Sequence, residues 1–325
     1  MLKSKTGLFT FHLFNESTRD QNQRPGELKL AETINFGPET KESEFVILGI
    51  SEDIGPQMNG GFPGAQKGFN AFMQAFQSVQ SNKFCSGENI GVLGEITQNI
   101  KFEYINKNKG AVEELDDFIL NVLTENISKG QKLIVIGGGH NNAFPLLKNL
   151  SILDTKRIHA INIDPHADCR SIEYRHSGNP FSCAINEDVI HNYSIFGLHE
   201  SYNNTYILDY LDRNACYYNT FENWLDDPNL WWSEFENFGN TASNDKSYSL
   251  DIDLDAISFL PTSALTPSGF SIEEIRKMIR SLSSNVDFSI LHLPEGAPET
   301  ENEHRLYGKI ISYFVLDFIK CQSKK

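Results

Sequence analysis

Six side chains of the types that bind metal ions stand at the ends of three apolar runs. One follows the run 133–136, three follow the run 158–163, and two stand at the end of the run 248–252. Side chains two residues apart in an extended segment point to the same side, so the members of each group are expected to converge. The set contains two imidazoles and four carboxylates: His140, Asp164, His166, Asp168, Asp251 and Asp253.

This donor set predicts a pair of divalent cations. Four carboxylates near one point repel one another and take up protons unless positive charge compensates them. An oxygen-rich set without thiolates suits Mn²⁺ better than a structural Zn²⁺ site, which favours Cys and His. Two ions roughly 3.5–4 Å apart would share bridging carboxylates and lower the pKa of a water held between them, producing hydroxide near neutral pH.

Each of the three motifs taken alone also fits a structural role. A histidine after glycines is typical of a turn, an Asp-x-His-x-Asp segment can be a solvated loop, and an Asp-x-Asp pair often lies on a surface. Their occurrence at three successive strand ends favours the metal site over these alternatives.

The elements that must position this site follow from the pattern of apolar residues. Five runs predict strands that are apolar on both faces, as in a parallel sheet covered on both sides: 45–50, 133–136, 158–163, 248–252 and 288–293. Helical spacing predicts a helix over 111–129 that ends at Gly130, and a capping box predicts a helix that begins after Ser271. The alternation indicates a three-layer α/β/α sandwich with a mainly parallel central sheet. Ligands bind such sheets beyond the carboxyl ends of the strands.

Length and charge limit the organisation and the partners. The 325 residues predict one catalytic domain over 45–325, with an N-terminal segment, 1–44, packed on it; residues 15–44 of this segment are polar. The net charge of −15 disfavours nucleic acids and anionic membranes as partners, and no run approaches the length of a membrane span. Five cysteines without a CxxC pair predict reduced thiols in a cytoplasmic protein.

The motifs together resemble the arginase, agmatinase and formimidoylglutamase family of binuclear manganese ureohydrolases. The blocks 137–140 (Gly-Gly-Gly-His), 164–168 (Asp-Pro-His-Ala-Asp), 249–253 (Ser-Leu-Asp-Ile-Asp) and 266–270 (Thr-Pro-Ser-Gly-Phe) occur in the family order, after a glycine-rich loop at 53–68. The resemblance implies an arginase-like fold, two Mn²⁺ per subunit and a homo-oligomer, a trimer or a hexamer. It implies a small amidine or guanidino compound as substrate.

The resemblance also assigns roles to the six ligands. One ion would be held by His140, Asp164, Asp168 and Asp251, and the other by Asp164, His166, Asp251 and Asp253. Asp164 and Asp251 would bridge the two ions, and Asp168 would orient the bridging hydroxide that attacks the sp² carbon of the substrate. His176 is a candidate proton shuttle to the departing amine, because an ordinary imidazole pKa near 6.5 suits that task; the alternative is an exposed loop histidine.

Several residues are similar to those of formimidoylglutamases in particular. Gly139 stands where arginases and agmatinases carry Asp, and the segments 168–170 and 177–181 also fit this branch. The guanidinium of Arg170 could bind a glutamate carboxylate, or else form a surface ion pair. With Asn59 and Ser177 as further substrate-binding residues, we expect hydrolysis of N-formimidoyl-L-glutamate to L-glutamate and formamide, a step of histidine catabolism.

Other residues depart from the family and leave alternatives open. The acidic residue of arginases near the end of the late strand has no clear match; Glu295 is shifted from it, and His292 can fill its place. Phe62 stands where formimidoylglutamases often have Arg. The alternatives are a guanidino hydrolase of the arginase or agmatinase type that releases urea, with Glu295 at the cationic end of the substrate, and a non-catalytic, metal-stabilised protein. The metal could also be Ni²⁺, Co²⁺ or Fe²⁺.

Overall fold

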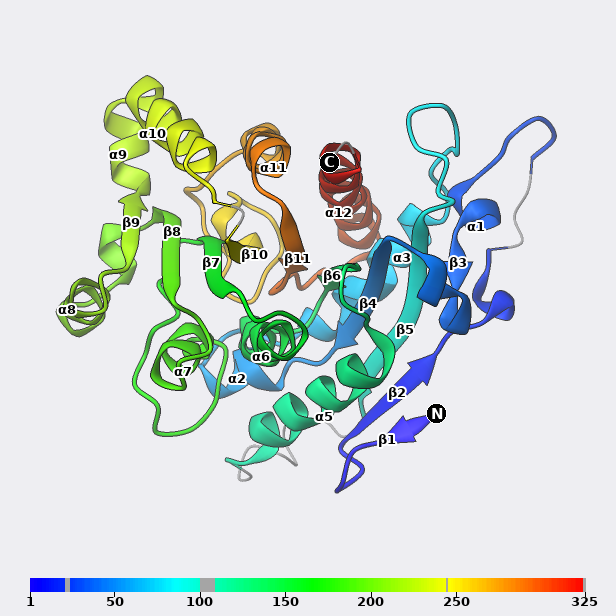
Figure 1. Ribbon diagram of the computed structural model, residues 1–325, viewed down its shortest axis with the longest axis horizontal. Coiled ribbons are helices and arrows are strands. Elements are labelled where there is room, and N and C mark those ends of the chain that lie inside the picture. Colours follow the sequence, from blue (N-terminus) through cyan, green and yellow to red (C-terminus); the bar gives the residue numbers. More distant parts are fainter. Residues whose placement is uncertain (21–23, 100–108, 244, 324–325) are drawn as a thin grey trace.

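A single large sheet runs through the molecule (Figure 1). The computed structural model describes residues 1–20, 24–99, 109–243 and 245–323. Within these ranges the sheet has 11 strands, in the order β1-β2-β5-β4-β6-β11-β10-β7-β8-β9, with β3 beside β5. The strands are β1 (Leu2–Lys3), β2 (Phe9–Leu13), β3 (Asn35–Phe36), β4 (Phe45–Ser51), β5 (Ile90–Gln98), β6 (Lys132–Ile136), β7 (Arg157–Ile163), β8 (Asn192–Leu198), β9 (Tyr217–Thr220), β10 (Lys246–Ile252) and β11 (Phe288–Leu293).

The sheet is parallel from β5 to β9, and β3 also pairs with β5 in parallel. The strands β1 and β2 are antiparallel additions at one edge, so the beginning of the segment 1–44 extends the sheet. Every residue of β4 is buried, as expected for a strand that is covered on both faces. All five predicted strands are present, and the predicted mainly parallel α/β architecture is confirmed.

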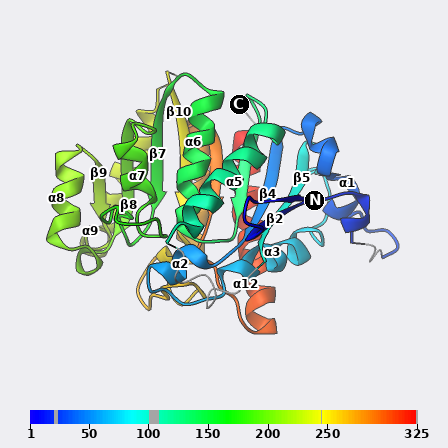
Figure 2. The same ribbon diagram turned by 90° about the horizontal axis from the view of Figure 1, so that it is seen from below.

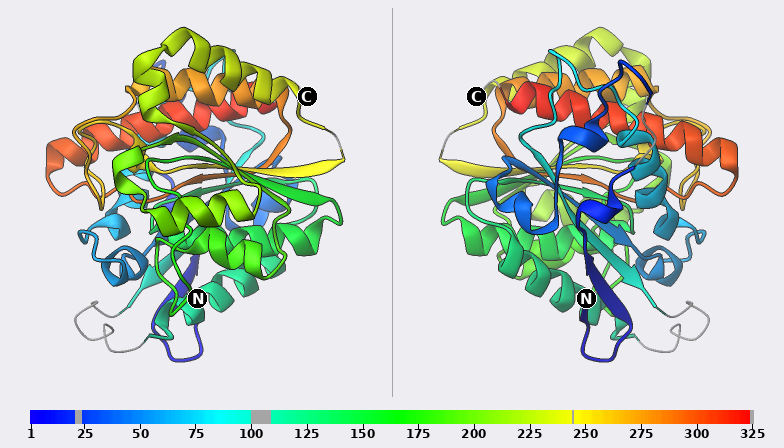
Figure 3. Two further views of the ribbon diagram at one scale, coloured as in Figure 1. Left: turned by 90° about the vertical axis from the view of Figure 1, so that its left-hand side faces the viewer. Right: turned by 90° about the vertical axis from the view of Figure 1, so that its right-hand side faces the viewer.

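Helices cover both faces of the sheet and bury an apolar cluster on each side. Buried side chains of α3, α10, α11 and α12 form one cluster, and those of α5, α6, α7 and α8 belong to the other. Figure 3 shows α10, α11 and α12 above the edge-on sheet, and Figure 2 shows α5 and α6 in front of it. The helices are α1 (Leu30–Thr33), α2 (Ile54–Met58), α3 (Gly68–Phe76), α5 (Ala111–Asn126), α6 (Ala143–Leu153), α7 (Pro180–Asn186), α8 (Thr205–Arg213), α9 (Phe221–Asp226), α10 (Pro228–Asn240), α11 (Ile272–Asn285) and α12 (Glu301–Gln322).

The predicted helix ends differ in how well they match the structure. The capping box of α11 is confirmed, because the Ser271 hydroxyl accepts the backbone N–H of Glu274 and the Glu274 carboxylate accepts that of Ser271. The helix predicted over 111–129 is too long: α5 ends at Asn126, and Gly130 lies in a turn beyond it. Ile127 is buried with an extended backbone, so burial of its side chain draws the chain out of the helix.

In the described ranges, no helix combines the length and the apolar character needed to cross a bilayer.

The central strands and the turns that follow them position the predicted site. The strands β6, β11, β10 and β7 are neighbours in the sheet, and their carboxyl ends therefore open onto one edge.

Candidate metal centre

Four adjacent strands bring the predicted ligands together. His140 lies in the turn after β6, Asp164 directly follows β7, and Asp251 stands near the end of β10 with Asp253 just beyond it. His292 of β11 pairs in register with Asp251. All five residues are buried, which requires their polar atoms to find partners or a cation.

One cluster forms around a single ring nitrogen of His140. Nδ1 of His140 lies 3.3 Å from Oδ2 of Asp164 and 3.0 Å from Oδ2 of both Asp168 and Asp253. Metal–ligand bonds of about 2.0–2.2 Å place neighbouring ligands of one ion about 3 Å apart. These four side chains therefore fit around one divalent cation.

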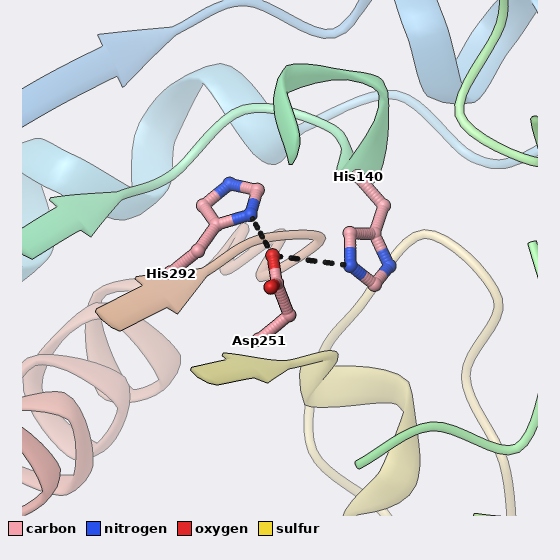
Figure 4. Close-up of side chains that lie close together, drawn as sticks. All are labelled: His140, Asp251 and His292. Atoms are coloured by element: carbon pink, nitrogen blue, oxygen red, sulfur yellow. Dashed lines mark hydrogen bonds and ion pairs between the residues drawn. The ribbon is translucent and has the colours of Figure 1, made fainter. Parts of the chain in front are cut away.

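A second cluster lies at the other nitrogen of the same ring (Figure 4). Oδ1 of Asp251 is 2.9 Å from Nδ1 of His292 and 3.8 Å from Nε2 of His140. Nε2 of His140 and Nε2 of His292 are buried and have no hydrogen-bond partner among the described residues. A buried nitrogen without a hydrogen-bond partner costs free energy. The two Nε2 atoms therefore also fit positions beside a metal ion. The Asp251 carboxylate, for which the family resemblance implies a bridging role, faces His292 in this structure.

His166 is the predicted ligand that joins neither cluster. Oδ1 of Asp164 accepts the backbone N–H of His166 at 2.6 Å, and Asp168 has a φ of 48°. The segment after β7 therefore turns, instead of continuing in the extended form expected from the sequence. The His166 ring stacks on Tyr202 with the ring centroids 5.3 Å apart, and its Nδ1 lies 3.5 Å from Asp164.

The electrostatics are those of an acidic cluster that needs positive charge. Burial raises the pKa of Asp253 well above its usual range, and the neighbouring Asp255 and Asp164 carboxylates raise it further. Burial lowers the pKa of His140, but its hydrogen bonds to the surrounding carboxylates prevail and raise it well above its usual value. Bound divalent ions would take the place of these protons.

A cavity of about 330 Å³ adjoins the first cluster and has the predicted substrate-binding residues in its wall. Asn59, Arg170 and Ser177 all line it, together with Asp168 and Asp253. The Asn59 side-chain amide donates to the Ser177 hydroxyl at 3.3 Å, which links the glycine-rich loop to the loop before α7. The exposed Arg170 thus lies on the same cavity as two candidate metal ligands.

Glu295 lies in the wall of the same cavity and also supports the metal cluster. Its Oε1 accepts the backbone N–H of His140 at 2.7 Å, and its Oε2 accepts the Ser263 hydroxyl. Burial and the nearby Asp255 carboxylate raise the pKa of Glu295 to about 8. Its φ of 70° is a left-handed backbone conformation that is uncommon for a residue with a side chain.

His176 is held away from the described part of the cavity wall. Its Nδ1 accepts the backbone N–H of Gly178 at 3.0 Å, and its ring lies against Tyr174 with centroids 5.4 Å apart. Burial lowers the pKa of His176 to about 4, and the positive charges of Arg170 and Arg175 add to this effect. The structure thus presents a buried, neutral imidazole at this position.

Two acidic residues that the sequence analysis did not single out belong to the site. Glu52 is fully buried just after β4, where both its oxygens accept hydrogen bonds from the loops around the site. Asp255 continues the alternation of Asp251 and Asp253, and it lines the cavity. In the sequence, Glu52 could have been found because it directly follows a predicted strand. Asp255 could have been found because it continues the two-residue spacing of Asp251 and Asp253.

Comparisons with known proteins agree with this architecture. A model of the arginase family matches residues 43–316. A formimidoylglutamase of Macrococcus caseolyticus is 28% identical over 178 residues, covering 54% of this chain and 53% of that protein. The crystal structure of Trypanosoma cruzi formiminoglutamase with Mn²⁺ has a TM-score of 0.71 at 23% identity, covering 90% of this chain and 98% of that one. Formimidoylglutamase from Bacillus subtilis has a TM-score of 0.76 at 13% identity, with coverages of 94% and 95%.

The extent of these matches differs between sequence and structure. The chain spans between 53% and 63% of the length of the first curated relatives it matches. At identities of 13% and 23%, the two solved structures establish the fold. The family model extends over well more than half of the sequence. This protein therefore belongs to the arginase family.

Proposed function

We propose that the protein is a metal-dependent hydrolase that converts N-formimidoyl-L-glutamate and water to L-glutamate and formamide. The observation that carries the proposal is one cavity bordered by both a buried cluster of candidate metal ligands and Arg170. The sequence similarity to formimidoylglutamases supports the choice of substrate.

The metal cluster is proposed to hold two ions, with Mn²⁺ as the native metal. His140, Asp164, Asp168 and Asp253 fit one ion in the geometry described. The family motifs give Asp253 to the second ion instead, together with His166 and the bridging Asp164 and Asp251. When bound, such ions supply a water of lowered pKa and polarise the substrate. Manganese in the Trypanosoma cruzi relative supports the choice of metal.

The remaining roles belong to side chains of the cavity. Arg170 is proposed to bind a substrate carboxylate through two parallel hydrogen bonds, and Asn59 and Ser177 to border the same end. Asp168, which joins the cluster and lines the cavity, is proposed to accept a proton from the attacking water. The water oxygen forms a bond to the amidine carbon, the bond from that carbon to the glutamate nitrogen breaks, and the nitrogen leaves with the proton that Asp168 accepted.

Gly139 supports the formimidoylglutamase assignment on steric grounds. A Cβ atom at Gly139 would lie 2.3 Å from Cδ of Pro56 and 2.4 Å from Oδ1 of Asn141. The position that carries Asp in arginases therefore has no room for a side chain in this chain. A guanidino substrate is the second candidate, because Glu295 offers a carboxylate on the cavity wall.

Turnover of three substrates by the Mn²⁺-loaded protein tests the proposal. N-formimidoyl-L-glutamate, arginine and agmatine are compared, with formamide and urea detected separately. Formamide from the first substrate alone is expected, and urea from either of the others would favour the guanidino alternative. Arg170→Gln should raise the KM for formimidoylglutamate, whereas the exposed control Arg305→Gln should not.

The metal assignment has its own variant. Asp251→Asn should abolish turnover and reduce the bound manganese measured by elemental analysis, because an amide is a weaker ligand than a carboxylate. Full activity in Asp251→Asn would refute the mechanism.

A further inference from the structure

Asp255 places an additional carboxylate in the wall of the cavity. It lies in the short turn Leu254–Ala256 after β10, and only 3% of it is exposed. Two hydrogen bonds hold it in place: its backbone N–H donates to Oδ1 of Asp253 at 2.8 Å, and its own Oδ1 accepts the backbone N–H of Ala264 at 3.2 Å. The turn thus fixes the carboxylate beside the candidate metal ligands.

Asp255 is not among the four carboxylates that are proposed to bind the two metal ions. Two divalent ions balance the four carboxylates proposed as ligands. Asp255 and Glu295 then remain as additional acids on the cavity wall. The oxygens of Glu295 already accept one hydrogen bond each, from the His140 backbone and from Ser263, so Glu295 is tied to the scaffold. Oδ1 of Asp255 accepts the backbone N–H of Ala264.

A carboxylate in this position suits a cationic ligand. Hydrogen bonds between charged groups are roughly twice as strong as those between neutral ones, and burial strengthens them further. An amidine is protonated at neutral pH and carries N–H donors, which match a carboxylate acceptor. Arg170 also lines the cavity, and a guanidinium matches the carboxylates of an amino acid.

We propose that Asp255 is a specificity-determining residue that binds the cationic amidine end of the substrate. This inference rests on the proposed function and deepens it: the cavity selects molecules that carry both an amidinium and a carboxylate. Asp255 therefore discriminates the amidinium from its neutral isostere, the amide.

The test compares a cationic and a neutral ligand of the same shape. Protonated N-formimidoyl-L-glutamate carries an NH₂⁺ group where N-formyl-L-glutamate carries a carbonyl oxygen, so the two differ in one positive charge and in the hydrogen-bonding character of that group. On the Mn²⁺-loaded protein, the KM and kcat of the first are measured, together with the inhibition constant of the second. Calorimetric titration gives the affinity of the formyl compound independently of turnover.

Asp255→Asn keeps the shape and the acceptor for the Ala264 N–H, so it removes the charge alone. We expect its KM for the amidine to rise by at least about tenfold, with the inhibition constant of the formyl compound changed by less than about twofold. Asp209→Asn, on the exposed surface of α8, removes a distant charge and should leave both values unchanged. Asp255→Glu, which retains the charge, should restore part of the discrimination.

The outcomes separate the two proposals. If the wild-type protein neither turns over the amidine nor binds the formyl compound, the proposed function is refuted. The wild-type protein can instead turn over the amidine and bind the formyl compound. If Asp255→Asn then leaves the ratio of the KM for the amidine to the inhibition constant of the formyl compound unchanged, only the role of Asp255 is refuted. Loss of bound manganese from Asp255→Asn would also overturn the inference, because it would place Asp255 with the metal.

Discussion

Glu52 is predicted to be a buried anchor on which the metal cluster depends. Its Oε2 accepts the backbone N–H groups of Ile54 at 2.7 Å and Gly55 at 3.2 Å. Its Oε1 accepts the backbone N–H of Gly139 at 2.8 Å, together with the side-chain amides of the two asparagines that follow His140. One carboxylate therefore joins the start of α2 to the turn that carries His140.

The effect of Glu52→Gln on the free energy of unfolding can be worked out from these hydrogen bonds. The amide oxygen can still serve Ile54 and Gly55 while its NH₂ faces the asparagines, whose own amides can rotate to accept. The N–H of Gly139 is then left without an acceptor, at a cost of about 1–3 kcal/mol, and the remaining bonds lose their charge assistance. Burial raises the pKa of Glu52, so relief from a buried charge offsets part of this loss. We expect the free energy of unfolding to fall by about 2–3 kcal/mol.

Urea denaturation of the metal-free protein measures this change, with Glu88→Gln, at an exposed glutamate, as the control. Because the Gly139 N–H directly precedes His140, Glu52→Gln should also weaken Mn²⁺ binding in a competition titration. A stability within about 0.5 kcal/mol of wild type, with unchanged metal affinity, would refute the anchoring role.

Two further predictions concern packing and pH. Gly139→Ala should destabilise the protein by about 1–3 kcal/mol, because the new Cβ would overlap the ring of Pro56. The control is Gly239→Ala in α10, which should be neutral or stabilising because the atom nearest to its new Cβ is 3.4 Å away. Equal thermal midpoints of the two variants would contradict this prediction. Burial lowers the pKa of His159 to about 4, so the unfolded chain binds a proton first and stability falls as pH drops from about 6.5 towards 4. The free energy of unfolding should therefore fall by about 2 kcal/mol less in His159→Gln than in the wild type between pH 7 and pH 5, as measured by denaturation curves. An unchanged pH dependence would show that His159 is not the responsible group.

The apolar runs do not give the order of the strands in the sheet. They do give the position in the chain at which each strand ends. Buried runs such as 133–136 and 158–163 identify central strands because both of their faces are apolar. In a parallel sheet those ends share one edge, so the position of His140 and Asp164 followed from the chain itself. The strands β1, β2, β3, β5, β8 and β9 were not predicted. The exact end of α5 was not predicted either, because packing of a single residue, Ile127, decides it.

What the sequence by itself determined is the chemistry: two imidazoles and four carboxylates at the ends of three predicted strands, with an arginine two residues after one of the carboxylates. Only the tertiary structure decided which side chains meet. Asp251 lies against His292, His166 turns onto Tyr202, and Glu52 ties together loops almost 90 residues apart in the chain. Beyond a strand end the side-chain direction depends on turns, such as the positive φ of Asp168, and on partners distant in sequence. The two-residue alternation that orders side chains within a strand does not extend to them.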